Sequence, residues 1–193
     1  DPDQIAAIMN AVGSKAVVTL AHFAGSETWA KISTIADSVP TLELILQVNP
    51  ANYLSFFSRM AVRLAGKPAY PTPRAHVADF GKLSQKHNLD RVLNEREITP
   101  DDVAMISAEI DDGDAVTLTR HTHADLLTTA WGWATAAGLD ENKVTFAALP
   151  FHYAPAFMLS GLVPWMQGAS IVIAAPTGYA GRGVVDNFWF IVD

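Results

Sequence analysis

The chain has 193 residues, of which 50% are hydrophobic and 17% are charged, and its net charge is −7. This composition is ordinary for a globular domain and excludes an intrinsically disordered chain. The acidic balance argues against nucleic-acid binding, which depends on Lys and Arg, and the absence of cysteine excludes disulfides, thiolate metal sites and a cysteine nucleophile.

Residues 1–66 predict a first α/β segment. Asp3 is the predicted cap of the first helix and Ser26 that of the second, because both precede residues with apolar side chains at helical spacing. Alternation of helices and strands along a chain favours a parallel sheet covered by helices. The predicted elements are helix 4–12, strand 16–20, helix 27–35, strand 42–48 and helix 53–64.

Residues 67–74 are rich in proline and predict a linker or surface crossing. Residues 75–193 follow as a second α/β segment, which we expect to pack with the first as one domain. An acidic turn at 111–114 indicates a hairpin. The predicted elements are strands 75–80, 103–107, 115–118, 144–149 and 170–174, and helices 82–94, 122–137, 156–167 and 184–192.

No targeting or membrane-spanning segment is visible in the sequence. The first residues have neither the basic nor the apolar region of a secretory signal. The most apolar window, 144–166, contains three prolines and His152, so it predicts buried elements rather than a membrane span. We expect a cytoplasmic protein.

Several short motifs have the order and approximate spacing of those in acyl-CoA synthetases of the AMP-forming superfamily. They lie at residues 3–6 with 16–20, 100–104, 120–124, 149–152, and 161–162 with 168–172. Over nearly its whole length the chain resembles part of the large N-terminal domain of these adenylate-forming enzymes. The resemblance implies layered α/β structure and an enzyme that uses ATP, Mg²⁺ and CoA to activate a carboxylic acid.

The phosphate loop of that family is not recognisable. Its Gly-Gly-Thr-Thr-Gly-x-Pro-Lys consensus falls on residues 110–117, none of which matches, and Thr117 stands in place of the lysine. Carboxylates reverse the local charge, and two like charges about 4 Å apart repel by about 1 kcal/mol in water. The positions that look degenerate are Asp111, Asp112, Gly113, Asp114 and Thr117.

The resemblance also implies that the family's adenine-binding motif, ribose-binding aspartate and C-terminal lysine lie beyond Asp193, and that Asp1 falls inside the large domain. We therefore expect a fragment without catalytic residues that binds no cofactor alone. In a fuller context it would be an AMP-forming acid–CoA ligase.

Phe151, His152 and Tyr153 follow the Leu-Pro of the 149–152 motif. By resemblance they line an acyl pocket, which implies a carboxylic or fatty acid ligand. An aromatic core cluster containing one hydrogen-bonded histidine is the alternative that the residues leave open.

His121 and His123 have a spacing seen in metal sites, with His152 as a third candidate ligand. Residues two apart in a helix point in different directions, and Thr122 between them is a natural helix cap. We therefore predict a helix start and no metal site.

Two further patterns predict structure rather than chemistry. The helix that contains Trp131 and Trp133 is apolar on much of its circumference, which predicts burial on more than one side. Residues 178–183 include three glycines and Arg182, and predict a surface loop, because the strand–loop–helix spacing of a nucleotide-binding fingerprint is absent.

In the family, segments before Asp1 and after Asp193 cover these elements. Apolar faces should therefore be uncovered, so we expect a homo-oligomer or a companion chain. The uncovered residues should be Trp131, Trp133, Phe157, Trp165, Phe188 and Trp189.

Three functions remain open at this point. The first is an acyl-CoA synthetase-like protein that activates carboxylic acids in its full context. The second is a non-catalytic relative that binds an acyl ligand or a protein partner. The third is a metal-dependent enzyme that uses the His121 and His123 region.

Overall fold

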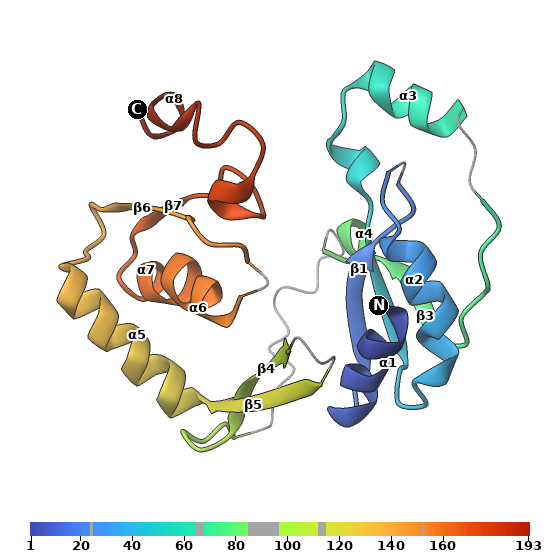
Figure 1. Ribbon diagram of the computed structural model, residues 1–193, viewed down its shortest axis with the longest axis horizontal. Coiled ribbons are helices and arrows are strands. Elements are labelled where there is room, and N and C mark those ends of the chain that lie inside the picture. The colour runs from blue at the N-terminus through green and yellow to red at the C-terminus, as the bar shows by residue number, and fades with distance from the viewer. Residues whose placement is uncertain (24, 65–67, 85–96, 112–114, 152) are drawn as a thin grey trace. The chain divides into compact units, whose positions relative to one another are not determined.

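The computed structural model describes residues 1–23, 25–64, 68–84, 97–111, 115–151 and 153–193. Helices alternate with mainly parallel strands, as predicted, so the expected α/β fold class is confirmed (Figure 1). The chain forms two compact units. Unit 1 is 1–95 with 108–117, and unit 2 is 96–107 with 118–193.

Unit 1 is built on an open sheet of parallel strands. Its elements are α1 (Pro2–Ala11), β1 (Ala16–Leu20), α2 (Thr28–Ile35), the 3-10 turn η1 (Ala36–Ser38), β2 (Leu44–Val48), the 3-10 turn η2 (Pro50–Tyr53), α3 (Phe56–Leu64), β3 (His76–Asp79) and α4 (Phe80–Ser84). The strand order is β1-β2-β3, and Val17 pairs with Ile45, which pairs with Val77.

The core of unit 1 lies between α1, α2 and one face of this sheet. Successive side chains of a strand point to opposite faces, so Val17 and Ile45 face these helices while Val18 and Leu20 lie on the other face, where both are exposed. The buried residues of this core are Ala6, Met9, Trp29, Ile32, Ile35, Ala36, Val39, Leu42, Ile45 and Ala75.

Two predicted caps in unit 1 are wrong. Asp1, not Asp3, caps α1: its carboxylate accepts a hydrogen bond from the Asp3 N–H at 2.8 Å, and Pro2 takes the first helical position. Helix α2 has Glu27 as its N-cap without a side-chain capping bond, while the Ser26 hydroxyl accepts a long bond of 3.4 Å from the Thr28 N–H.

The Pro-rich segment is described from residue 68 onward, and residues 68–74 have neither helix nor strand. They connect α3 to β3 inside unit 1. Of the predicted helix 82–94, residues 85–94 lie outside the described part of the chain.

A β-hairpin follows and supplies residues to both units. It consists of β4 (Val103–Ile110) and β5 (Val116–Thr122), which pair as a two-stranded sheet. Both strands are longer than predicted: β4 continues toward the acidic turn as far as Ile110, and β5 continues away from the turn as far as Thr122.

Unit 2 packs helices beside a second parallel pair of strands. Its further elements are α5 (His123–Ala137), β6 (Val144–Phe146), α6 (Ala154–Phe157), the π-helix η3 (Met158–Leu162), α7 (Val163–Met166), β7 (Ser170–Val172), the 3-10 turn η4 (Gly178–Ala180) and α8 (Phe188–Val192). The core joins Leu126, Ala130 and Ala134 of α5 to Met158 and Val163.

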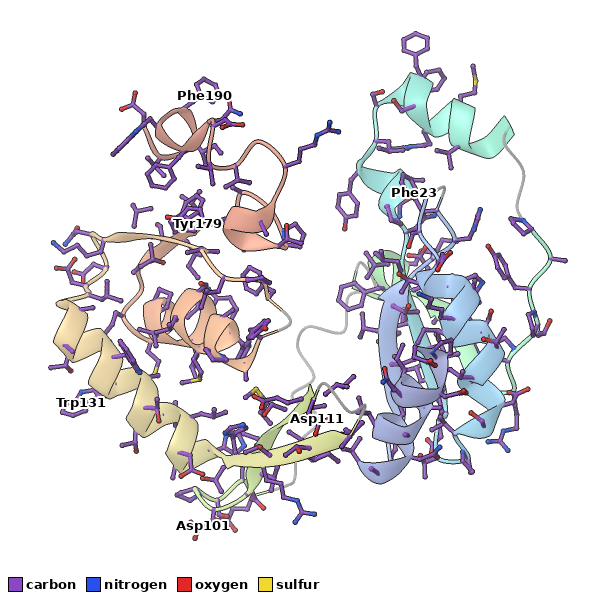
Figure 2. All side chains as sticks on the ribbon, in the orientation of Figure 1. Phe23, Asp101, Asp111, Trp131, Tyr179 and Phe190 are labelled. Carbon is purple, nitrogen blue, oxygen red and sulfur yellow. The ribbon has the colours of Figure 1, made fainter. Side chains whose placement is uncertain are left out.

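Unit 2 also corrects the prediction about the tryptophans. Trp131 and Trp133 are 61% and 54% exposed, so α5 buries one face within this chain and not several. Figure 2 shows the Trp131 side chain pointing outward from α5. The small residues Ala130 and Ala134 make the contact instead, because they let the following helices approach closely.

In the described ranges of the chain, none of the helices has the length and apolar character needed to cross a bilayer. The apolar window that begins at Val144 is divided among β6, α6, η3 and α7.

Candidate functional site

The loops that follow β6 and β7 lie side by side. The Phe151 N–H donates to the Pro176 carbonyl at 3.0 Å, and the Tyr179 N–H donates to the Ala148 carbonyl at 2.9 Å. Because β6 and β7 are parallel, both loops leave the same edge of the sheet. The carboxyl ends of parallel strands are where open α/β sheets most often bind ligands.

Gly178 makes the close approach of these loops possible. Its φ is +57°, a left-handed conformation that favours glycine, and a Cβ placed on it would lie 2.2 Å from the Ala148 carbonyl oxygen. The glycine is buried, so the predicted surface loop 178–183 is wrong at this residue. The glycine is apparent in the sequence, but its close contact with Ala148 joins residues that are far apart in the chain.

Aromatic rings gather beside the same strand ends. Phe146, the last residue of β6, stacks on Tyr179 with ring centres 5.2 Å apart and an interplanar angle of 22°. Phe188 contacts both rings, at 5.2 Å and 6.0 Å. The sequence reasoning missed Phe146 and Tyr179, because nothing local indicates that residues this far apart in the chain meet. Their ring faces give this end of unit 2 an apolar and aromatic character.

The predicted acyl-pocket residues lie in the loop after β6. Phe151 is half-buried, while Tyr153 is 59% exposed and is the N-cap of α6, where its carbonyl accepts the Ala156 N–H at 2.9 Å. Tyr153 therefore does not belong to a buried aromatic core. His152 lies outside the described residues.

Of the predicted phosphate-loop positions, Asp111 follows β4 directly and Thr117 lies on β5 of the hairpin. The Asp111 N–H donates to the Ala115 carbonyl at 3.1 Å, and the Ala115 N–H donates to the Asp111 carboxylate at 2.9 Å. Phosphate loops bind through convergent backbone N–H groups and a lysine. Here both of these N–H groups bond within the turn, and Thr117 is an exposed residue of β5. Asp112, Gly113 and Asp114 lie outside the described residues.

The histidines of the 121–123 motif have local roles, as predicted. His121 lies on β5, where its Nε2 is 3.0 Å from the Ser107 hydroxyl, while Thr122 caps α5 and His123 begins it. Within the ranges that the structure describes, no three His, Asp or Glu side chains are grouped so that they could hold a metal ion.

Thr122 and Asp125 form a reciprocal capping box at the start of α5. The Asp125 N–H donates to the Thr122 hydroxyl and the Thr122 N–H donates to the Asp125 carboxylate, each at 3.1 Å. The side chain of Thr122, its backbone N–H and the nearby His121 imidazole lower the pKa of the Asp125 carboxyl below its usual value. This exposed carboxylate is a structural group.

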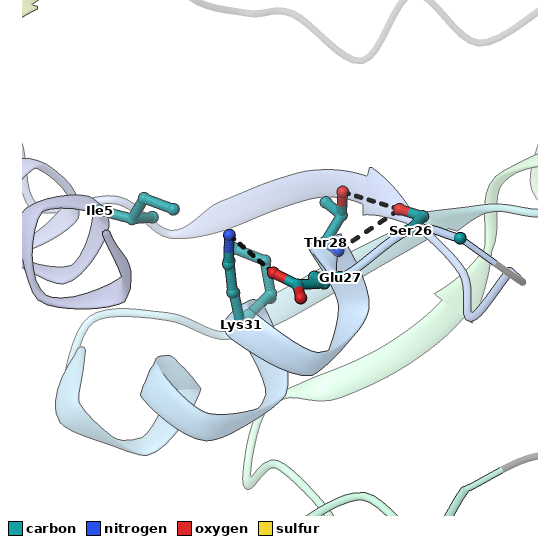
Figure 3. A pocket seen from close by; sticks show the side chains of 7 residues that line it. Ile5, Ser26, Glu27, Thr28 and Lys31 are labelled. Carbon is teal, nitrogen blue, oxygen red and sulfur yellow. Dashed lines mark hydrogen bonds and ion pairs between the residues drawn. The ribbon is translucent and has the colours of Figure 1, made fainter.

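An open pocket of about 540 Å³ lies in unit 1 between α1 and the start of α2. Its polar groups already bond one another: Lys31 pairs with Glu27 at 3.2 Å, and the Ser26 hydroxyl donates to the Thr28 hydroxyl at 3.0 Å (Figure 3). No sequence motif indicated this pocket. It is lined by Ile5, Gly25, Ser26, Glu27, Thr28, Lys31 and Ile32.

Comparison with known proteins supports the resemblance to AMP-forming ligases. A marinolic acid–CoA ligase from Pseudoalteromonas sp. (strain SANK 73390) is 24% identical over 127 residues, which are 63% of this chain and 19% of that protein. The chain thus spans about a fifth of the length of this curated relative. No protein-family model matches the chain.

Solved structures of adenylate-forming enzymes have the same fold. An anthranilate CoA ligase, AuaEII, in complex with anthranoyl-AMP, matches 96% of this chain and 30% of its own, with a TM-score of 0.61 and 19% identity. ATP-bound MatB from Rhodopseudomonas palustris matches 98% of this chain and 31% of its own, with a TM-score of 0.59 and 15% identity.

A long-chain-fatty-acid-CoA ligase (FadD1) from Archaeoglobus fulgidus matches 96% of this chain and 30% of its own, with a TM-score of 0.56 and 15% identity. The predicted resemblance to AMP-forming ligases is confirmed, and the fold is that of part of their N-terminal domains.

Proposed function

We propose that this chain is an acyl-CoA synthetase-like protein that binds a hydrophobic carboxylic acid beside the loops following β6 and β7. The observation that carries the proposal is the pair of backbone hydrogen bonds, from Phe151 to Pro176 and from Tyr179 to Ala148, that joins these loops. The half-buried Phe151 and the exposed Tyr153 would contact the apolar part of the acid, and His152 completes the proposed set.

The character of the surrounding surface supports an apolar or aromatic acid. Phe146, Tyr179 and Phe188 are packed ring against ring at the same strand ends. Ligand pockets are generally lined by such side chains, with a small number of polar groups that fix the ligand's orientation. A named relative is a marinolic acid–CoA ligase, and AuaEII was solved with anthranoyl-AMP, so acyl and aryl acids are both reasonable classes of ligand.

We also propose that this chain does not adenylate the acid by itself. The hairpin tip has Asp111 where the phosphate loop would offer glycine and hydroxyl groups, and the N–H groups of Asp111 and Ala115 bond within the turn. Carboxylates repel a polyphosphate and so oppose its binding, unless a cation lies between them. ATP, Mg²⁺ and CoA would be substrates and cofactors of a fuller enzyme that contains this part.

Acid binding is tested by thermal unfolding in a panel of fatty and aryl carboxylates. A ligand that binds only the folded chain raises its melting temperature by mass action. Tyr153→Ala and His152→Ala should abolish the shift. Tyr153→Ala should leave the unliganded melting temperature unchanged, because the side chain is exposed. Tyr53→Ala, an equally conservative change at an exposed tyrosine of unit 1, should retain the shift. A panel without any shift would refute acid binding.

The adenylation part is tested separately by calorimetry with Mg-ATP and by pyrophosphate exchange with the same acids. We expect neither a saturable isotherm nor exchange. Micromolar ATP binding would contradict the proposal about the hairpin and leave the acid-binding proposal standing.

A further inference from the structure

Arg182 lies in the loop after β7, one of the two loops beside which we propose that the acid binds. Its side chain is exposed. It is the only Lys or Arg of these loops, which comprise residues 147–153 and 173–187. A carboxylic acid is ionised at neutral pH, so a site that binds it must replace the water around its charge. Arg182 is the permanent cation that these loops supply for this purpose.

The guanidinium of Arg182 has no structural role in the described part of the chain. It has neither an ion pair nor a hydrogen bond among these residues, although Asp186 lies only four residues further along the same loop. By contrast, Arg59 and Arg74 donate to backbone carbonyls and so hold their own segments in place. A guanidinium that is not committed in this way can bind a carboxylate through two parallel hydrogen bonds.

The backbone next to Arg182 is fixed by close packing. Gly181 precedes it, and an added Cβ on this glycine would overlap with the Ala175 side chain, so the approach requires glycine. Ala175 is followed by Pro176, whose carbonyl accepts the Phe151 N–H at 3.0 Å. These contacts bring the backbone at Arg182 to the junction of the two loops, where Phe151 is proposed to contact the apolar part of the acid.

We propose that Arg182 binds the carboxylate of the acid, so that the site selects ionised carboxylic acids over their neutral analogues. The proposal rests on the proposed acid-binding function and adds the polar group that fixes the orientation of the ligand. The apolar part of the acid lies against Phe151 and Tyr153, and its charged end is directed toward Arg182. Hydrogen bonds between two charged groups are stronger than neutral ones, so the carboxylate contributes to affinity as well as to orientation.

The experiment is calorimetry on the 193-residue protein with benzoate and octanoate and with their neutral amides, benzamide and octanamide. The unsubstituted protein should bind each acid roughly tenfold or more tightly than its amide, which is the usual effect of a hydrogen bond to a charged group. Arg182→Gln should abolish this preference by weakening the binding of the acids while the binding of the amides stays unchanged. Added salt should weaken only the binding of the acids.

Lys143→Gln is the matched control. Lys143 is also an exposed cation of unit 2, but it directly precedes β6 and so lies at the opposite end of the β6–β7 sheet. This variant should keep the preference for the acids. Arg182→Gln should keep the melting temperature of the unliganded protein, because the side chain is exposed. If it lowers that temperature, Arg182→Met, which is also neutral, provides the same comparison.

Two results with the variants would overturn the role of Arg182 and leave the acid-binding function standing. These are a preference for the acids that persists in Arg182→Gln, and a preference that Lys143→Gln abolishes as well. Equal affinity of the unsubstituted protein for acids and amides would also overturn it. Binding of none of the four compounds would refute the acid-binding function, and the role of Arg182 with it.

Discussion

At Gly178 the backbone of the loop after β7 touches that of the loop after β6. An added Cβ would meet the Ala148 carbonyl at 2.2 Å, and the positive φ is costly for any other residue. We predict that Gly178→Ala lowers the free energy of unfolding by about 2–5 kcal/mol, as the sum of left-handed strain and steric overlap. Chemical denaturation measures the difference.

Gly138→Ala is the matched control for this prediction. Gly138 has a φ of +60°, but a Cβ there would have nothing within 4 Å. Only the conformational cost of about 1–2 kcal/mol should remain. Equal losses for the two variants would mean that the loops have room to separate, which would weaken the proposed binding site as well.

Thr19 places a hydroxyl in the core of unit 1 without a visible partner. Its Oγ1 is buried and has no hydrogen bond within the described part of the chain. Thr19→Val keeps the shape and removes the polar atom, so we predict a gain of about 1 kcal/mol in the free energy of unfolding. Ser33→Ala is the contrast: the buried Ser33 hydroxyl donates to the Ala30 carbonyl at 3.0 Å, and its loss should destabilise by about 1 kcal/mol. A loss of stability in Thr19→Val would imply an unseen partner.

Helix α5 is defined at both ends by its own residues. The capping box of Thr122 and Asp125 begins it, and Gly138 ends it with a left-handed φ. Helix α3, in contrast, is attached through Arg59 to η2, and the segments after it join it to β3. Helix α5 therefore ends where expected and begins one residue later than predicted. Helix α3 begins three residues later than predicted, because the 3-10 turn η2 includes Tyr53.

The lowered pKa of Asp125 predicts a pH dependence of stability. The folded pKa lies below the unfolded value, so the stabilising contribution of this carboxylate is fully present above the unfolded value, about pH 4, and is lost as the pH falls through the folded value. Asp125→Asn should therefore be less stable than the original chain at neutral pH, and the difference should shrink in acid. Thermal unfolding between neutral and acidic pH checks this.

Thr122→Ala tests the other half of the capping box. It should cost about 1 kcal/mol, the usual value for an N-cap hydroxyl, and it should also reduce the acid dependence, because Thr122 is the main cause of the lowered pKa. If Asp125→Asn changes stability by the same amount at every pH, the capping box does not account for the lowered pKa.

At the scale of the whole molecule, both units leave large apolar side chains exposed. In unit 1 these include Tyr53, Phe56 and Phe57, and in unit 2 they include Trp131, Trp133, Trp165, Trp189 and Phe190. Phe190 is seen to point outward in Figure 2. Contiguous apolar surface of more than a few hundred Å² is rare on soluble monomers. We therefore expect the isolated chain to self-associate or to bind a companion chain.

Light scattering after size exclusion, with an apolar dye as a probe of exposed surface, measures this association. A monodisperse monomer that binds no dye would contradict the expected association.

The sequence by itself determined those elements whose boundaries depend on neighbouring residues. The apolar run of β1 was predicted to the residue, and Thr122 and Gly138 marked the two ends of α5. The alternation of helix and strand patterns likewise predicted the α/β fold, because such patterns have few ways to form a common core.

Only the tertiary structure decided the features that depend on partners distant in the chain. Strand β6 ends at Phe146 because its pairing with β7 stops there, although the apolar sequence continues. The same applies to the exposure of Trp131, the π-helical turn at Met158–Leu162, and the contact of Gly178 with Ala148. A local pattern records which residues can be buried, but which of them are buried depends on what the folded chain brings against them.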